Sequence, residues 1–233
     1  MIFLFSHAYR QAGTSNFKLL IAVLIFLMVS GALIANSQAA PEFLITWKAN
    51  SYVPSEYQGK ALPIADSIIN IGLDLMVGGK IVDLSKNQVQ WTLNGKLTDS
   101  GLGLKNLNVR LNKLSNTNLN LIIKINYKGS ELNKFVVIPV AEPEVVIKTI
   151  NKSTLKANPY FFNVQNLNQL SFNWSVNNQK PVGKPKLPNI LEIEGVNLMP
   201  TESIIKNRVD IETTIINLEN QLEKAVGRLF LKI

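Results

Sequence analysis

The 233-residue chain contains no cysteine and only one histidine, His7. Without cysteine it has no disulfide, no thiolate nucleophile and no zinc–thiolate site. Because His7 precedes a long apolar stretch, everything beyond residue 39 also lacks imidazole. Serine and cysteine hydrolases need an imidazole base, and most zinc, copper and haem sites need imidazole or thiolate ligands. The sequence therefore predicts a non-catalytic protein with no cofactor and no metal.

Two chemistries need neither residue type: catalysis by paired carboxylates, and calcium binding by oxygen ligands. Calcium loops cluster their aspartates, whereas Asp66, Asp74, Asp83 and Asp99 stand singly along the chain. We therefore expect no calcium site. A carboxylate-based, glycan-active enzyme is kept only as the remotest alternative.

The net charge is +8, and the basic residues are scattered without forming a run. No glycine-rich phosphate loop, RNP-like motif or arginine cluster accompanies them, so nucleic acid is not an expected partner. We interpret the charge as solubility charge, with attraction to an anionic surface or polymer as the alternative. Apolar residues make up 46% of the chain, which is enough for a proper core.

An uncharged apolar segment runs from Leu19 to Ala35. Its length lies between that of a signal-peptide core and that of a membrane-spanning helix. Arg10 and Lys18 precede it, which predicts a cytoplasmic N-terminus and export of the rest. Small residues before the bond that follows Ala39 suit signal peptidase. Residues 1–40 are thus a signal peptide or a membrane anchor, and the chain is either secreted or held outside the cytoplasmic membrane.

From Glu42 onward the apolar residues recur at every second position, as one buried face of a sheet requires. Glycine- and asparagine-rich turn signals separate the alternating stretches. The pattern predicts strands and turns in the following places: strands at 43–47, 69–75, 87–93, 119–125, 135–140, 144–150, 160–164, 170–176, 190–193, 209–216 and 228–233, and turns at 78–79, 94–95, 99–101, 128–130 and 177–178. Residues 218–225 have some helical character, and a turn of helix or a plain turn is expected there.

Two stretches match each other: residues 89–95 read apolar–polar–Trp91–hydroxyl–apolar–Asn–turn, and residues 172–178 repeat this around Trp174. The repeat predicts an all-β chain with two immunoglobulin-like sandwiches, residues 42–140 and 144–233, after the N-terminal helix. In such domains a tryptophan on the third strand fills the core. We expect Trp91 and Trp174 to be these core residues, with exposed sugar-stacking tryptophans as the alternative.

These motifs resemble those of bacterial cell-surface immunoglobulin-like or PKD-like domains. Together with residues 45–63 and 157–164 they are also similar to exported two-domain proteins of small-genome candidate-phyla bacteria. The resemblance covers most of residues 42–233. It implies tandem sandwiches outside the membrane and assigns no functional residue.

Aromatic residues gather at two further places. Trp47, Tyr52 and Tyr57, with Pro54 and Gly59, predict a loop that packs on the first domain; a ligand platform or a membrane-surface belt is the alternative. The triplet at 160–162 is expected to be core.

The sequence thus favours a monomeric, non-catalytic surface protein with a structural, adhesive or protein-binding role. Its partner is a protein or a glycan of unspecified identity, besides the membrane if the N-terminal helix is retained. The alternative is a membrane-anchored accessory subunit of an envelope assembly such as a pilus or secretion machine.

Overall fold

The computed structural model describes residues 39–112, 118–181, 186–193 and 208–232. No helix within these ranges is long and apolar enough to cross a membrane. The predicted apolar helix at 19–35 lies outside the described residues. The described chain is built from strands with one short 3₁₀ turn, η1 (Leu167–Gln169). The predicted all-β class is confirmed for this part of the chain.

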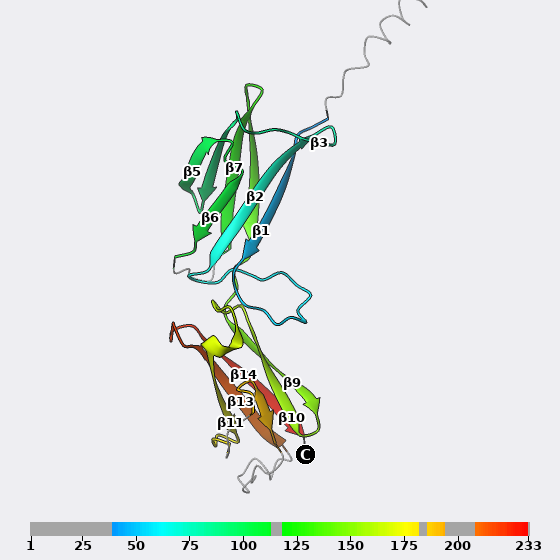
Figure 1. Cartoon of the computed structure of the whole chain (residues 1–233), viewed down its shortest axis with the longest axis vertical. Helices are drawn as coiled ribbons and strands as arrows, with labels where there is room; N and C mark the ends of the chain where they lie inside the picture. The colour runs from blue at the N-terminus through cyan, green and yellow to red at the C-terminus, as the bar shows by residue number, and fades with distance from the viewer. Residues whose placement is uncertain (1–38, 113–117, 182–185, 194–207, 233) are drawn as a thin grey trace, which may run out of the picture. The chain divides into compact units, whose positions relative to one another are not determined.

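Eight strands between residues 42 and 138 form two antiparallel sheets (Figure 1). Their bounds are β1 (Glu42–Ala49), β2 (Ile68–Val77), β3 (Lys80–Ile81), β4 (Gln88–Leu93), β5 (Lys96–Leu102), β6 (Asn106–Arg110), β7 (Leu119–Tyr127) and β8 (Ser130–Ile138). One sheet has the order β1-β2-β3, with β6 also paired to β2, and the other has the order β5-β4-β7-β8. Buried residues of both sheets share one core.

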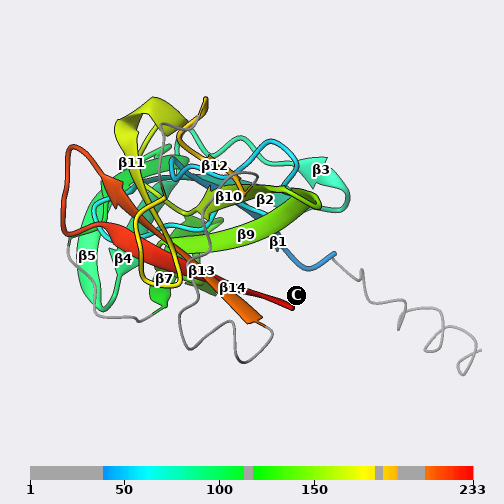
Figure 2. The ribbon, with the colours of Figure 1, turned by 90° about the horizontal axis from the view of Figure 1, so that it is seen from below.

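The strands from residue 144 onward form two three-stranded sheets, β12-β10-β9 and β11-β13-β14. Their bounds are β9 (Glu144–Asn151), β10 (Thr154–Tyr160), β11 (Leu170–Val176), β12 (Ile190–Glu192), β13 (Arg208–Asn217) and β14 (Lys224–Lys232). Figure 2 shows β13 and β14 side by side. A second, separate apolar cluster joins these two sheets. Both halves share an immunoglobulin-like arrangement, in which β1, β2 and β6 face β4, β7 and β8, and β9, β10 and β12 face β11, β13 and β14.

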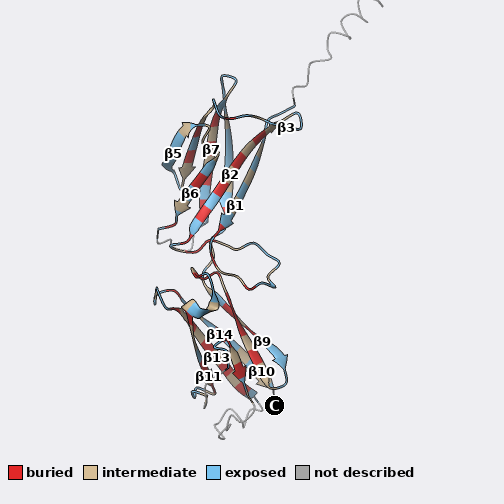
Figure 3. Cartoon of the chain, in the orientation of Figure 1, coloured by how far each residue is buried: buried red, intermediate tan, exposed pale blue. Residues whose placement is uncertain are grey.

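Alternation explains which side chains fill the cores. On β2, Ile69, Ile71, Leu73 and Leu75 are buried while the intervening side chains face outward. Figure 3 shows the same alternation of buried and exposed residues along β2. Because successive side chains of a strand point to opposite faces, this period of two commits one face of each strand to the core.

The hairpin turns use residues that tolerate positive φ. Asn94 and Gly95 have φ of 50° and 78°, and Lys128 and Gly129 have φ of 50° and 79°. Two consecutive residues with positive φ define the type I′ turn, whose twist matches that of the flanking strands. These turns fix the registers of β4 with β5 and of β7 with β8.

Two local predictions are wrong. Residues 99–101 lie inside β5 rather than in a turn, since they pair with Trp91, Gln90 and Val89 of β4. The strand predicted at 160–164 ends at Tyr160, since Phe161 turns the chain with a φ of 59°. Of the two alternatives expected over 218–225, the plain turn is found: residues 218–223 form bends and a turn, and β14 begins at Lys224.

Candidate functional site

Trp91 and Trp174 occupy corresponding places in the two halves, on β4 and β11. Trp91 is fully buried and Trp174 is 8% exposed. The indole Nε1–H of Trp91 donates to the Leu104 carbonyl at 2.9 Å, and that of Trp174 donates to the Pro188 carbonyl at 3.0 Å. Each acceptor lies two residues before an edge strand of the opposite sheet, β6 or β12. Buried and bonded in this way, neither ring is free to stack on a ligand.

The aromatic residues predicted to form one loop do not pack together in the structure. Trp47 packs against the first core, and Lys60 Nζ lies 3.6 Å from the centroid of its ring. Burial lowers the pKa of Lys60. Tyr52 instead packs against the second core and pairs with Phe162 through the backbone. The expectation that the whole loop packs on the first domain is therefore wrong, since Tyr52 in the segment that follows β1 contacts the second core.

Tyr57 joins the aromatic triplet instead. Its ring centroid lies 5.4 Å from that of Tyr160 and 5.9 Å from that of Phe161, both in edge-to-face geometry. Phe161 and Phe162 are buried, as predicted, whereas Tyr160 is only half-buried. Edge-to-face aromatic contacts fasten the segment to the end of β10.

Two of the four single aspartates, Asp74 and Asp83, bond to polar groups of the fold. Asp74 accepts from Lys105 Nζ at 2.8 Å, and Asp83 accepts from the backbone and the hydroxyl of Ser85, both at 2.9 Å. Among the described residues, no three Asp, Glu, His or Cys side chains come together in a geometry that could hold a metal ion. The bonds from Ser85 lower the pKa of Asp83.

The outer face of β5-β4-β7-β8 carries an apolar row that sequence reasoning missed. The registers place Leu97 beside Thr92, Thr92 beside Ile122, and Ile122 beside Phe135, so the row crosses all four strands. Leu97 is 58% exposed, Phe135 is 56% exposed, and Val137 next to it on β8 is 45% exposed. We call Leu97, Thr92, Ile122, Phe135 and Val137 the outer row. It was invisible in the sequence because its members are contiguous only across strands.

Beside the outer row, Lys124 Nζ on β7 pairs with Glu131 Oε1 on β8 at 2.9 Å. Exposed pairs of this kind contribute little stability. Because the two charges are opposite and adjacent, they leave this part of the face without a dominant charge.

The first sheet carries a groove of mixed polar and apolar lining, formed by residues of β1, β2 and β6. It has a volume of about 460 Å³ and is lined by Thr46, Asn70, Asn106 and Asn108 around Gly72, with Trp47 at its border. Gly72 leaves space there: a Cβ at this position would lie 2.9 Å from Thr46 Oγ1. The groove is open and shallow.

A carboxylate is buried in the second half, in the turn before β14. Glu223 is 7% exposed. Its Oε1 accepts from the Asn163 backbone N–H at 2.5 Å, and its Oε2 accepts from Asn217 Nδ2 at 3.2 Å. Burial, assisted by the charge of Asp66, raises the pKa of Glu223 despite these bonds.

Comparison with known proteins assigns no family, since no family model matches the chain. No curated protein matches it either. Among solved structures, the chain is similar to the fibronectin(III)-like modules of Clostridium thermocellum CbhA, with 15% identity, coverage of 81% of this chain and 94% of that chain, and a TM-score of 0.28. It is also similar to immunoglobulin domains 1–4 of Sidekick-1, with 15% identity, coverage of 84% and 70%, and a TM-score of 0.23.

A third similar structure is the Bacteroides ovatus SGBP-B protein of a mixed-linkage glucan utilization locus, in complex with a mixed-linkage heptasaccharide. The identity is 16% and the TM-score 0.26, and the match covers 84% of this chain but only 48% of that one. The immunoglobulin-like assignment made above rests on strand order and on the two closed cores.

Proposed function

We propose that this chain is a non-catalytic, exported surface protein whose two immunoglobulin-like sandwiches form a structural and protein-binding module. The observation that supports this role is the outer row on β5-β4-β7-β8. Solvent-facing sides of antiparallel sheets are usually polar, whereas this one presents Leu97, Phe135 and Val137 to water. Contiguous exposed apolar side chains mark interaction surfaces.

The partner that suits this face is another protein. Binding to an anionic membrane or polymer would favour a cluster of unpaired basic side chains. Next to the outer row, however, Lys124 is paired with Glu131. Protein–protein interfaces typically have an apolar centre and a polar border, and this face has both.

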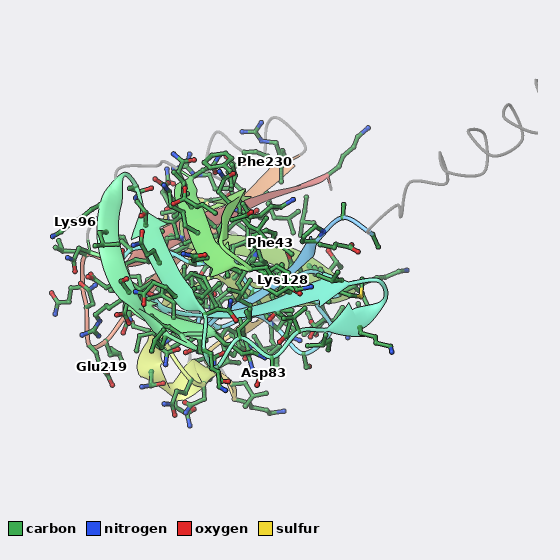
Figure 4. All side chains as sticks on the ribbon, turned by 90° about the horizontal axis from the view of Figure 1, so that it is seen from above. Phe43, Asp83, Lys96, Lys128, Glu219 and Phe230 are labelled. Atoms are coloured by element: carbon green, nitrogen blue, oxygen red, sulfur yellow. The ribbon has the colours of Figure 1, made fainter. Side chains whose placement is uncertain are left out.

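Site-specific crosslinking tests the role. A photoreactive phenylalanine analogue is placed at Phe135 in the full chain, and in a control at Phe230 on β14, which is 55% exposed (Figure 4). We expect a discrete crosslinked species from position 135 in cells that make the protein, and none from position 230. Val137→Ser should abolish the species at 135 without changing the melting temperature, because an exposed side chain contributes little to folding.

Equal crosslinking from both positions would contradict the proposal, as would survival of the species in Val137→Ser. A crosslink to a second copy of the chain would contradict the proposal that the protein is a monomer that binds a different protein. A crosslink to a multi-subunit membrane complex would favour the accessory-subunit alternative.

Export is tested separately by adding protease to intact spheroplasts. Digestion of residues 42–233 is expected, and full protection would exclude an outside location.

A further inference from the structure

A pocket of about 480 Å³ lies on the outer side of β10. The segment after β1 forms one wall with Tyr52, Pro54 and Glu56. Lys156 and Asn158 of β10 line its floor, and Leu187 belongs to the stretch before β12. Its volume falls within the range of about 300–1,000 Å³ found for small-molecule sites.

Asn158 faces this pocket and not the core of its own sandwich. Leu155 and Ala157 of β10 belong to the second core, so alternation directs Lys156 and Asn158 to the opposite face. The face is covered because Tyr52 N–H donates to the Phe162 carbonyl at 2.6 Å. The cover leaves Asn158 only 1% exposed.

The Asn158 amide has no hydrogen-bond partner among the described residues, although both Oδ1 and Nδ2 are buried. A carboxamide carries two donor hydrogens and an acceptor oxygen. Leaving such a group buried and unpaired is costly, so native structures rarely do so without a functional reason. An unpaired amide at the floor of a pocket is suited to a ligand that both donates and accepts hydrogen bonds.

The pocket's charges cancel. Lys156 Nζ pairs with Glu56 Oε1 at 3.2 Å, so neither group is left to hold an ion. Burial, and the nearby charge of Glu56, raise the pKa of the Tyr52 phenol. Pro54 and Leu187 supply apolar wall. These features favour a neutral ligand with apolar faces and polar edges.

The strand order argues against a peptide as the occupant. β10 is the central strand of β12-β10-β9. It pairs with β9 from Thr154 to Tyr160, and with β12 only from Thr154 to Lys156. Beyond that pairing the Ala157 N–H already donates to the Asn189 carbonyl, and Pro159 has no N–H to add to a ladder. Adding a peptide strand needs a continuous free edge, which β10 does not offer beside Asn158. The ligand must therefore hydrogen-bond the Asn158 amide through its substituents and not through a peptide backbone.

We propose that this pocket binds a neutral saccharide of one or two rings, with Asn158 bonding a vicinal hydroxyl pair or an acetamido group of the sugar. The ring's C–H faces lie against Pro54 and Leu187, and Tyr52 and the Glu56–Lys156 pair bond outlying hydroxyls. The site is independent of the outer row and of any protein partner bound there.

The test uses the full chain in a detergent without a sugar headgroup. Saturation-transfer NMR is recorded with four probes at millimolar concentration: glucose, cellobiose, N-acetylglucosamine and N,N′-diacetylchitobiose. We expect transfer to at least one probe, and an affinity at least about tenfold lower in Asn158→Leu, as loss of paired hydrogen bonds requires. The melting temperature of Asn158→Leu should equal or exceed that of the wild type, because the variant removes a buried unpaired amide.

Asn173→Leu is the matched control, since Asn173 is an exposed asparagine on β11 of the same sandwich. It should bind the probe like the wild type. The proposal is overturned if none of the four sugars receives saturation, which would indicate a merely hydrated pocket, or if Asn158→Leu binds as tightly as the wild type. A melting temperature of Asn158→Leu well below that of the wild type would also overturn it, because the amide would then have partners within the fold.

Discussion

Thr213 on β13 lies directly opposite Trp174 on β11, and both side chains face the core of the second sandwich. The Thr213 hydroxyl is fully buried and has no hydrogen-bond partner among the described residues. Its neighbours along the same face of β13, Ile211 and Ile215, are apolar. The indole beside it already donates to Pro188, so it cannot satisfy the hydroxyl as well.

The first prediction follows from this unpaired hydroxyl. Thr213→Val should raise the free energy of unfolding by about 1 kcal/mol, because it replaces a desolvated hydroxyl by a methyl group of similar shape. Urea unfolding of the wild type and the variant measures the change. Thr214→Val on the opposite face of β13, where the side chain is half-buried, should stay within about 0.5 kcal/mol. Destabilisation by Thr213→Val would show that the hydroxyl is bonded in solution.

The second prediction concerns the two tryptophans. Trp91→Ala and Trp174→Ala should each cost about 3–5 kcal/mol through lost burial and the cavity left behind. Since the two apolar clusters are separate, each change should act mainly on its own half. Calorimetry should therefore show Trp91→Ala lowering the transition of the first half while that of the second persists, and Trp174→Ala the reverse.

A ligand-stacking role would give a different result, namely stable alanine variants that had lost binding. The fluorescence of both indoles should be that of buried rings, with Trp47 as a third, half-buried contributor. Solvent-like emission with unchanged melting in either alanine variant would contradict the core assignment.

The third prediction concerns pH. The pKa of Glu223 in the folded chain is raised above its ordinary value of 4.5, so the folded state binds more protons than the unfolded state. The contribution of Glu223 to stability is thus fully present below pH 4.5 and is lost as the pH rises through the raised pKa. In Glu223→Gln the glutamine does not titrate, so the dependence of unfolding free energy on pH should become flatter across this window.

At neutral pH, Glu223→Gln should unfold with a free energy within about 1 kcal/mol of the wild type. A neutral amide avoids the desolvation of a charge and can still accept from the Asn163 N–H. Its Nε2, however, takes the place of the oxygen that accepts from Asn217 Nδ2, so that hydrogen bond is lost. Glu219→Gln, an exposed change in the same turn (Figure 4), is the control and should leave the pH profile as it is. An unchanged slope in Glu223→Gln would refute the assignment of the titration to Glu223.

The fourth prediction is that residues 42–233 fold without the apolar segment that precedes them. The two cores are built from residues of this range, from Phe43 onward. Circular dichroism of the fragment should show a β-sheet spectrum, and sedimentation should show a monomer. A mainly helical spectrum would contradict the fold.

Strand positions were largely predictable because period-two alternation is a local signal. Residues 69–75, 119–125 and 209–216 lie within β2, β7 and β13. β5 was missed because its sequence, KLTDSGL, is almost wholly exposed and has no buried face to produce alternation. The strand predicted at 160–164 was displaced because three consecutive aromatic residues suggest a strand regardless of the turn at Phe161.

The sequence by itself determined the β class, the two-part plan and the positions of Trp91 and Trp174, because each follows from a short pattern read along one strand. Only the tertiary structure decided which residues meet across strands or between distant segments. The outer row of Leu97, Ile122 and Phe135 exists through register alone. Asn158 is buried because a segment about 100 residues earlier in the chain covers its strand. Local alternation records only which face of a strand is buried, whereas pairing and covering depend on contacts between residues far apart in the sequence.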